Sequence, residues 1–179
     1  MKWELSFVFY IFIVYNLSQY SNVTEKKDMA VKDFNLERYL GRWYEIVRMP
    51  SSFEKDLTNV TANYSLRSDG KVKVLNSGYK DNKNGKYTEA AGRAKFFKDS
   101  NIGHLKVSFF WPFYADYIII DLDKEKYSYA MVSSSNSYLW ILSRSPQMDR
   151  EILNRLLEKA ESLGYDMEKI IFVSQDWAK

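Results

Sequence analysis

The chain has 179 residues, of which 46% are hydrophobic and 17% aromatic, so it is long enough for one domain with a substantial core. Its formal charge of +3, from 26 basic and 23 acidic residues, is too balanced to indicate nucleic acid, which is typically bound by a concentrated basic stripe. Because the sequence contains no cysteine, no disulfide forms, and stability has to come from packing.

The N-terminus carries an apolar run over residues 5–17. This run is shorter than the about 20 apolar residues that a membrane-spanning helix needs, so we interpret residues 1–21 as an export signal, whether or not it is removed. Residues 22–34 are mostly polar and are predicted to link that segment to a single domain over residues 35–179.

The sequence then alternates between apolar and polar residues in short runs rich in Tyr, Val, Phe and Ile. Turn residues separate these runs, such as Ser68-Asp69-Gly70 and the Asn-rich stretch 81–85. Eight strands of this kind predict an all-β fold, an antiparallel up-and-down barrel wide enough for side chains or one small ligand. The expected strands begin at Trp43 and continue as residues 60–66, 72–76, 87–97, 105–109, 116–121, 127–132 and 138–142.

Strand alternation assigns one set of side chains to the inside of this barrel. Ala90 and its neighbour Gly92 are small, which favours space for a ligand, although four large aromatic rings in the set are able to fill the interior instead. The residues predicted to line a ligand are Ala62, Tyr64, Val74, Asn76, Ala90, Val107, Phe109, Ile118, Tyr138 and Trp140.

The richest aromatic cluster spans residues 109–114, where the fifth strand turns into the sixth. In an up-and-down barrel that begins at Trp43, this turn falls at the open end. We therefore expect Trp111, Phe113 and Tyr114 at the mouth, either packed on the rim or as a surface for a membrane or a second copy of the chain.

After the last strand the apolar period changes to that of an amphipathic helix over residues 152–163, which is expected to pack outside the barrel. Ser145, followed by proline, is the first choice for the N-cap, with Asp149 as the alternative. Gly164 suits the C-terminal end of the helix, and residues 170–173 predict a short final strand near the first one.

Gly41, Trp43 and Arg144 together resemble the lipocalin signature, in which the tryptophan closes the barrel floor and the arginine covers its ring. The likeness extends over several motifs in the same order and is strongest to bacterial lipocalins of the apolipoprotein D-like group. The segments that carry it are residues 36–46, 60–66, 106–114 and 138–146.

This resemblance implies a calyx that binds fatty acids, lysophospholipids or similar lipids in the cell envelope, supporting membrane maintenance without chemistry on the ligand. It implies export to the periplasm or the outer membrane, no cofactor, no metal, and a monomer or homodimer. Bacterial relatives commonly carry an acylated cysteine after the signal peptide, and this chain has no cysteine to acylate. Two alternatives remain open: a carrier of another hydrophobic cargo such as a pigment or haem, and an interaction protein with a plugged barrel.

Catalysis has little support in the sequence, and we predict that the protein is not an enzyme. His104 is the single histidine, next to a glycine at a strand start, where we expect it to face solvent. The route of a cysteine-dependent lipocalin isomerase is closed, because there is no thiol. Asp116 and Asp121 are the remaining candidates for a lone base.

Overall fold

The structure is a computed structural model that describes residues 28–52, 54–80, 85–134 and 138–176. The predicted export segment therefore lies outside the described residues. Among those that are described, no helix has both the length and the apolar character needed to cross a membrane.

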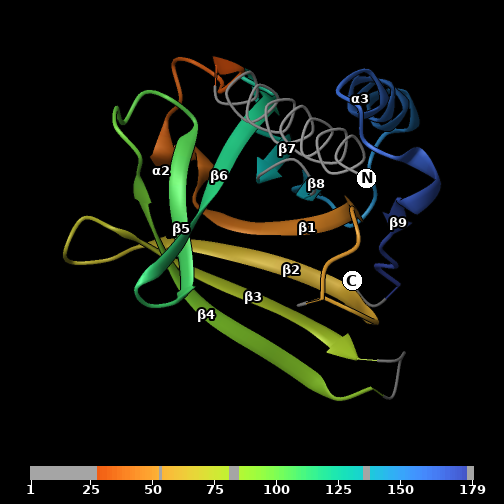
Figure 1. Ribbon diagram of the computed structural model, residues 1–179, viewed down its shortest axis with the longest axis horizontal. Helices are drawn as coiled ribbons and strands as arrows, with labels where there is room; N and C mark the ends of the chain where they lie inside the picture. Colours follow the sequence, from red (N-terminus) through yellow and green to blue (C-terminus); the bar gives the residue numbers. More distant parts are fainter. Residues whose placement is uncertain (1–27, 53, 81–84, 135–137, 177–179) are drawn as a thin grey trace, which may run out of the picture.

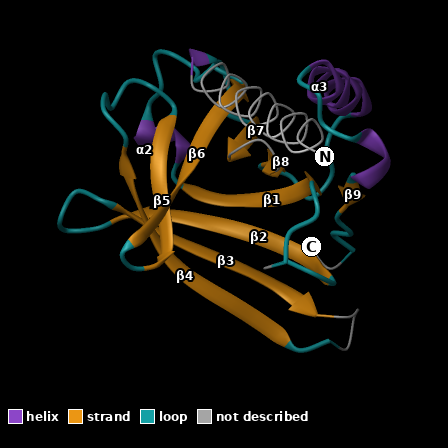
Figure 2. Cartoon of the chain, viewed as in Figure 1, coloured by secondary structure: helices purple, strands orange, loops and turns teal. Residues whose placement is uncertain are grey.

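The described residues form a strongly curved antiparallel sheet with helices beside it (Figure 1, Figure 2). In chain order the elements are α2 (Leu36–Tyr39), β1 (Gly41–Arg48), β2 (Leu57–Leu66), β3 (Val72–Lys80), β4 (Tyr87–Phe96), β5 (His104–Phe110), β6 (Phe113–Leu122), β7 (Tyr129–Ser134), β8 (Tyr138–Ser143), α3 (Arg150–Ser162), the 3₁₀ helix η1 (Met167–Lys169) and β9 (Ile171–Phe172).

Strand β1 closes the sheet into a barrel, because it pairs with β8 on one side and with β2 on the other. Strands β2 to β8 each pair with their neighbours in sequence, which is the up-and-down order expected from the alternation. The prediction of an eight-stranded closed barrel is confirmed. The long strands β2, β3 and β4 run together toward one end, where β4 continues beyond its pairing with β5 (Figure 1).

The C-terminal segment completes the closure where β1 and β2 separate. Strand β9 pairs with β1, which confirms the expected final strand. Beyond it, the Gln175 side-chain amide donates hydrogen bonds to the backbone carbonyls of Glu45 and Val60, both at 2.8 Å. One side chain from the end of the chain thus satisfies a carbonyl on each of the two diverging strands.

Two hydrophobic clusters lie on opposite faces of the sheet. The inner cluster contains Trp43, Tyr64 and Val74, and fills the lower part of the barrel. The outer cluster contains Leu156 and Ala160 of α3, which pack against the outside of the strands, as predicted for this helix. Burial of these two apolar surfaces is the main favourable contribution to folding.

Helix α3 begins later than the first choice from the sequence. The prediction of Ser145 as the N-cap is wrong, and the alternative, Asp149, is confirmed: its carboxylate accepts from the backbone amides of Glu151 and Ile152 at 2.9 and 3.1 Å. Asp149 places an anion at the positive end of the helix dipole, which adds to its capping hydrogen bonds. Gly164 follows the helix with a φ of +79°, as expected for its C-terminal end.

Ile118 lies on the opposite face from the one expected. Its neighbours Tyr117 and Ile119 belong to the inner cluster, whereas Ile118 packs in the outer cluster. The physical reason is that this part of β6 is buried on both faces, so three successive isoleucines carry no apolar-polar alternation from which to read the inward side.

The segment before α2 packs on the barrel from residue 28 onward, where a linker was expected. Val31 donates its amide to Ile119 O at 2.9 Å and accepts from the Gly103 amide at 2.8 Å. Phe34 is buried in the inner cluster. The folded domain therefore begins within the expected linker of residues 22–34.

The expectation of a solvent-facing His104 is wrong. The residue is 6% exposed, its ring lies against Phe97 at 4.5 Å between centroids, and its Nε2 is 2.6 Å from Asp116 Oδ1. Its neighbour Gly103 is held by the N-terminal segment described above, which covers this strand start. The sequence near His104 carries no sign of that distant cover.

Candidate ligand-binding site

The floor of the barrel is built around Trp43, which is fully buried. Its indole Nε1 donates to Tyr39 O at 2.8 Å, and the Arg144 guanidinium lies 3.9 Å from the ring centroid. The stacking of Arg144 on Trp43 is therefore as the sequence predicted. This end of the barrel is closed by packed rings.

Arg144 also connects the segments around the floor. Its guanidinium donates to the carbonyls of Arg42, Arg38 and Leu40 at 2.7 to 2.9 Å. Gly41 has a φ of +95°, which favours glycine, and an added Cβ would lie 3.3 Å from Arg144 Nη1. Glycine at this position therefore permits the positive φ and leaves space for the Arg144 guanidinium.

Above the floor, three tyrosine hydroxyls form a chain inside the barrel. Tyr117 Oη is 2.7 Å from Tyr39 Oη and 2.8 Å from Tyr64 Oη. Burial raises the pKa of all three phenols, so they stay neutral and supply each other's hydrogen bonds. The sequence reasoning missed Tyr39 and Tyr117, and the alternation around Tyr117 was obscured by the doubly buried β6.

A second polar cluster lies higher on the inner side of β1. A register shift between Glu45 and Val47 places both Ile46 and Val47 in the outer cluster, which brings Glu45 and Arg48 to the inner face. Arg48 Nη1 donates to Glu45 Oε1 at 2.8 Å. Alternation in the sequence does not reveal such a bulge, so the inward position of Arg48 could not be predicted from the sequence.

Arg48 and Glu54 tie the loop after β1 to the barrel. Arg48 Nη2 donates to the carbonyls of Glu54 and Leu57 at 2.7 and 3.2 Å. The Glu54 carboxylate accepts from Trp140 Nε1 at 3.1 Å and from Ser51 Oγ at 3.0 Å. Arg48 Nε has no hydrogen-bond partner among the described residues and is buried.

Burial raises the pKa of the Glu45 carboxyl to about 8, and the nearby Glu54 carboxylate adds to the shift. The Arg48 guanidinium opposes it, but burial prevails. Because the folded-state value lies above the ordinary value of 4.5, the stability linked to Glu45 is complete below about pH 4.5 and is lost as the pH rises toward 8.

Glu45→Gln is therefore expected to flatten the pH dependence of stability. In the wild type, the free energy of unfolding should fall between about pH 5 and pH 8, by up to roughly 4 kcal/mol, and in the variant most of this slope should disappear. Urea unfolding at a series of pH values measures both curves. Glu158→Gln, an exposed carboxylate on α3, is the control and should keep the wild-type slope. An unchanged slope in Glu45→Gln would contradict the assignment.

The inner wall of β2, β3 and β4 carries small side chains in register. Asn76 pairs with Ala62 on one side and with Ala90 on the other, so the three residues form a row across the strands. Ala90 is exposed although it shares a face with the buried Ala62, so solvent reaches the inner wall at this end. The buried Asn76 Oδ1 has no hydrogen-bond partner among the described residues.

The remaining predicted lining residues lie at different levels between the floor and the mouth of the barrel. Tyr64 and Val74 belong to the buried inner cluster, and Val107 and Trp140 pack against it. Tyr138 stacks on Trp140 with 6.0 Å between ring centroids. Phe109 lies over Gly92 and is 37% exposed, because β5 separates from β4 at this point.

The turn between β5 and β6 presents the aromatic rim. Trp111 and Phe113 are 72% and 77% exposed, and Phe110 is exposed to a similar degree. Tyr114 is partly buried, with Lys95 Nζ 5.0 Å from its ring centroid. In the up-and-down strand order, this turn falls on the same side as the loop between β1 and β2, which is the side predicted for the mouth.

The two carboxylates considered as bases have structural partners. Asp116 Oδ1 is 2.8 Å from Lys106 Nζ, in addition to its contact with His104. Although burial favours the protonated form of Asp121, hydrogen bonds from Arg155 and Lys159 hold its pKa below the usual range, and this cluster fixes α3 to the barrel. Among the described residues, no three His, Asp or Glu side chains are grouped as metal ligands.

A closed eight-stranded antiparallel barrel with a packed floor and an external C-terminal helix defines a calyx-type protein. Residues 34–175 match the family of the lipocalin-like domain, and the chain belongs to the lipocalins. Solved structures agree on the fold: insecticyanin from the tobacco hornworm Manduca sexta superposes with a TM-score of 0.66 at 22% identity, covering 83% of this chain and 85% of that one.

Named relatives refine this placement. The chain is 49% identical over 146 residues to outer membrane lipoprotein Blc of Vibrio cholerae, which covers 81% of this chain and 85% of that protein. It is 44% identical over 147 residues to outer membrane lipoprotein Blc of Escherichia coli K12, with 82% of each chain covered. Mouse apolipoprotein D is 36% identical over 154 residues, covering 80% and 78%. The expected likeness to bacterial lipocalins and to apolipoprotein D is confirmed.

Proposed function

We propose that this lipocalin binds a lipid, a fatty acid or a lysophospholipid, inside the barrel and stores or carries it in a bacterial cell envelope. The observation that carries the proposal is the row of Ala62, Asn76 and Ala90, where small side chains and solvent access meet on the inner wall. The relatives named as outer membrane lipoproteins support the envelope location.

The chemistry of the inner wall suits an amphiphile. An acyl chain lying on the apolar wall is stabilised by roughly 0.8 kcal/mol per buried methylene group. The unpartnered Asn76 Oδ1 and Arg48 Nε offer one acceptor and one donor to a polar head. The proposed activity is binding without turnover.

The first test is native mass spectrometry of the mature protein from its own cells, followed by organic extraction and lipid identification. A bound fatty acid or lysophospholipid supports the proposal, and a pigment or haem would replace it with a carrier of that cargo. An empty protein that also fails to take up a fluorescent fatty acid would contradict it and favour a barrel filled by its own side chains.

Ala90→Trp is expected to weaken the uptake of a fluorescent fatty acid at least tenfold, because the new indole occupies the inner wall beside Asn76. Asn63→Trp is the matched control, since Asn63 is exposed on β2 one position after the inward-facing Ala62. Fluorescence titration measures both affinities, and circular dichroism verifies the fold. Equal affinities for the two variants would place the ligand elsewhere.

A further inference from the structure

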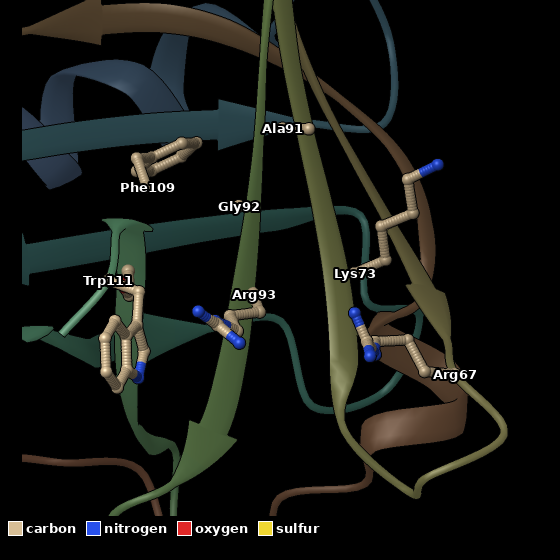
Figure 3. Close-up of a pocket in the computed structure, with 8 residues that line it drawn as sticks. Arg67, Lys73, Ala91, Gly92, Arg93, Phe109 and Trp111 are labelled. Atoms are coloured by element: carbon tan, nitrogen blue, oxygen red, sulfur yellow. The ribbon is translucent and has the colours of Figure 1, made fainter.

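A pocket of about 280 Å³ opens where β5 separates from β4 (Figure 3). A single water needs only roughly 10–15 Å³ of such space, so the pocket admits a group the size of a phosphate. Lys73, Arg93 and Ser108 pair across β3, β4 and β5 on the face opposite the inward-facing Val74 and Ala94. These three residues place the pocket on the outer face, away from the row of Ala62, Asn76 and Ala90, although Gly92 and Phe109 at the inward positions of β4 and β5 also line it.

The walls of this pocket are strongly basic. Arg67, Lys73 and Arg93 all line it, and Arg93 lies between the Trp111 indole and Arg67 in Figure 3. Arg67 is paired with Asp69 at 3.0 Å. Neither Lys73 nor Arg93 has a described carboxylate oxygen within 4.0 Å, so both cations of the pocket wall are uncompensated. In Figure 3 the Lys73 side chain extends away from Arg93, so both cations act on one ligand only when the Lys73 side chain turns toward the pocket.

Ser108 supplies an independent indication of a ligand. Ser108 is one of the residues that line the pocket, it is only 4% exposed, and its Oγ has no hydrogen-bond partner among the described residues. A buried hydroxyl without a partner is costly, and such groups in folded proteins are commonly satisfied by a bound species. An anionic oxygen beside two cations is the acceptor that suits this hydroxyl.

The aromatic rim identifies where the anion comes from. Trp111 lines the pocket and also belongs to the exposed turn with Phe110 and Phe113, whose rings are 75% and 77% exposed. Three large apolar side chains exposed together are typical of an interaction surface, and indole rings are enriched at the level of lipid headgroups. A membrane surface offers both an apolar layer for the rings and phosphate groups for the cations.

We propose that this outer pocket binds the phosphate group of a membrane phospholipid while the turn at residues 110–113 enters the lipid surface beside it. Ser108 Oγ donates a hydrogen bond to a phosphate oxygen, and Lys73 and Arg93 neutralise its charge. The open end of the barrel is then held against the membrane. This docking is distinct from lipid binding on the inner wall and does not depend on it.

Vesicle co-sedimentation of the full chain tests the proposal, using phosphatidylglycerol–phosphatidylethanolamine vesicles and phosphate-free galactolipid vesicles. The variant Lys73→Gln/Arg93→Gln is expected to lose at least tenfold in affinity for the phospholipid vesicles, and Ser108→Ala about threefold. The wild type should bind the galactolipid vesicles at least tenfold more weakly. Both variants and the wild type carry the same N-terminal segment, so differences among them report the pocket.

The matched control is Lys124→Gln/Lys126→Gln, which removes the same charge from the exposed loop after β6, at the floor end. It should change the affinity less than twofold, and fatty-acid uptake should be unchanged in every variant. Unchanged binding in Lys73→Gln/Arg93→Gln, or an equal loss in the control, would overturn the proposal. Calorimetry with inorganic phosphate separates the sources: binding as tight as that of the vesicles would overturn the membrane role.

Discussion

Trp43→Ala is expected to lower the free energy of unfolding by about 3–5 kcal/mol, as for other fully buried aromatic residues cut back to alanine. The change removes the ring on which Arg144 stacks and which packs against Tyr39, with 4.8 Å between ring centroids. The indole hydrogen bond to Tyr39 O is lost as well. Urea unfolding without ligand, followed by far-ultraviolet circular dichroism, measures the effect.

Trp111→Ala is the matched control, because it removes the same side chain from the exposed turn. Its free energy of unfolding should stay within about 0.5 kcal/mol of the wild type, as is usual at exposed positions. A Trp43→Ala variant that keeps wild-type stability but loses fatty-acid binding would show that Trp43 contacts ligand and does not close the floor.

Arg48→Met is expected to destabilise the protein by about 3–5 kcal/mol above pH 8, because it leaves a buried carboxylate and two loop carbonyls without their donor. The loss should be smaller near pH 5. At that pH, Glu45 remains protonated in the folded state, since burial holds its pKa at about 8 and removal of Arg48 raises it further. Urea unfolding at the two pH values measures both losses.

The double variant Glu45→Gln/Arg48→Met separates the carboxylate from the carbonyls. Its loss relative to Glu45→Gln should be nearly the same at both pH values, because the titrating group is gone. The remaining destabilisation then reports the hydrogen bonds to Glu54 O and Leu57 O. A loss for Arg48→Met that does not change with pH would contradict the coupling between Glu45 and Arg48.

The number of strands, their order and the external helix follow from patterns that are local in the chain. Alternation with period two, turn residues between the runs and a final stretch with helical period each act over a few residues, so the sequence carries them directly. The stacking of Arg144 on Trp43 was predicted from the resemblance to the lipocalin signature, and the distance between the guanidinium and the ring agrees with it. Nearly all inward positions on β2 and β3 are read from alternation, because one face of these strands is polar.

The features that only the tertiary structure decided arise where segments distant in the sequence pack against each other. Burial of β6 on both faces reversed the side expected for Ile118, and the N-terminal segment covered the strand start that holds His104. The bulge in β1 turned Arg48 inward. The outer pocket forms where β5 separates from β4, and its cations Lys73 and Arg93 come from the neighbouring strands β3 and β4. The hydrophobic period and the turn residues thus determine the barrel. Packing between distant segments decides which polar groups are buried together, and therefore how far their pKa values shift.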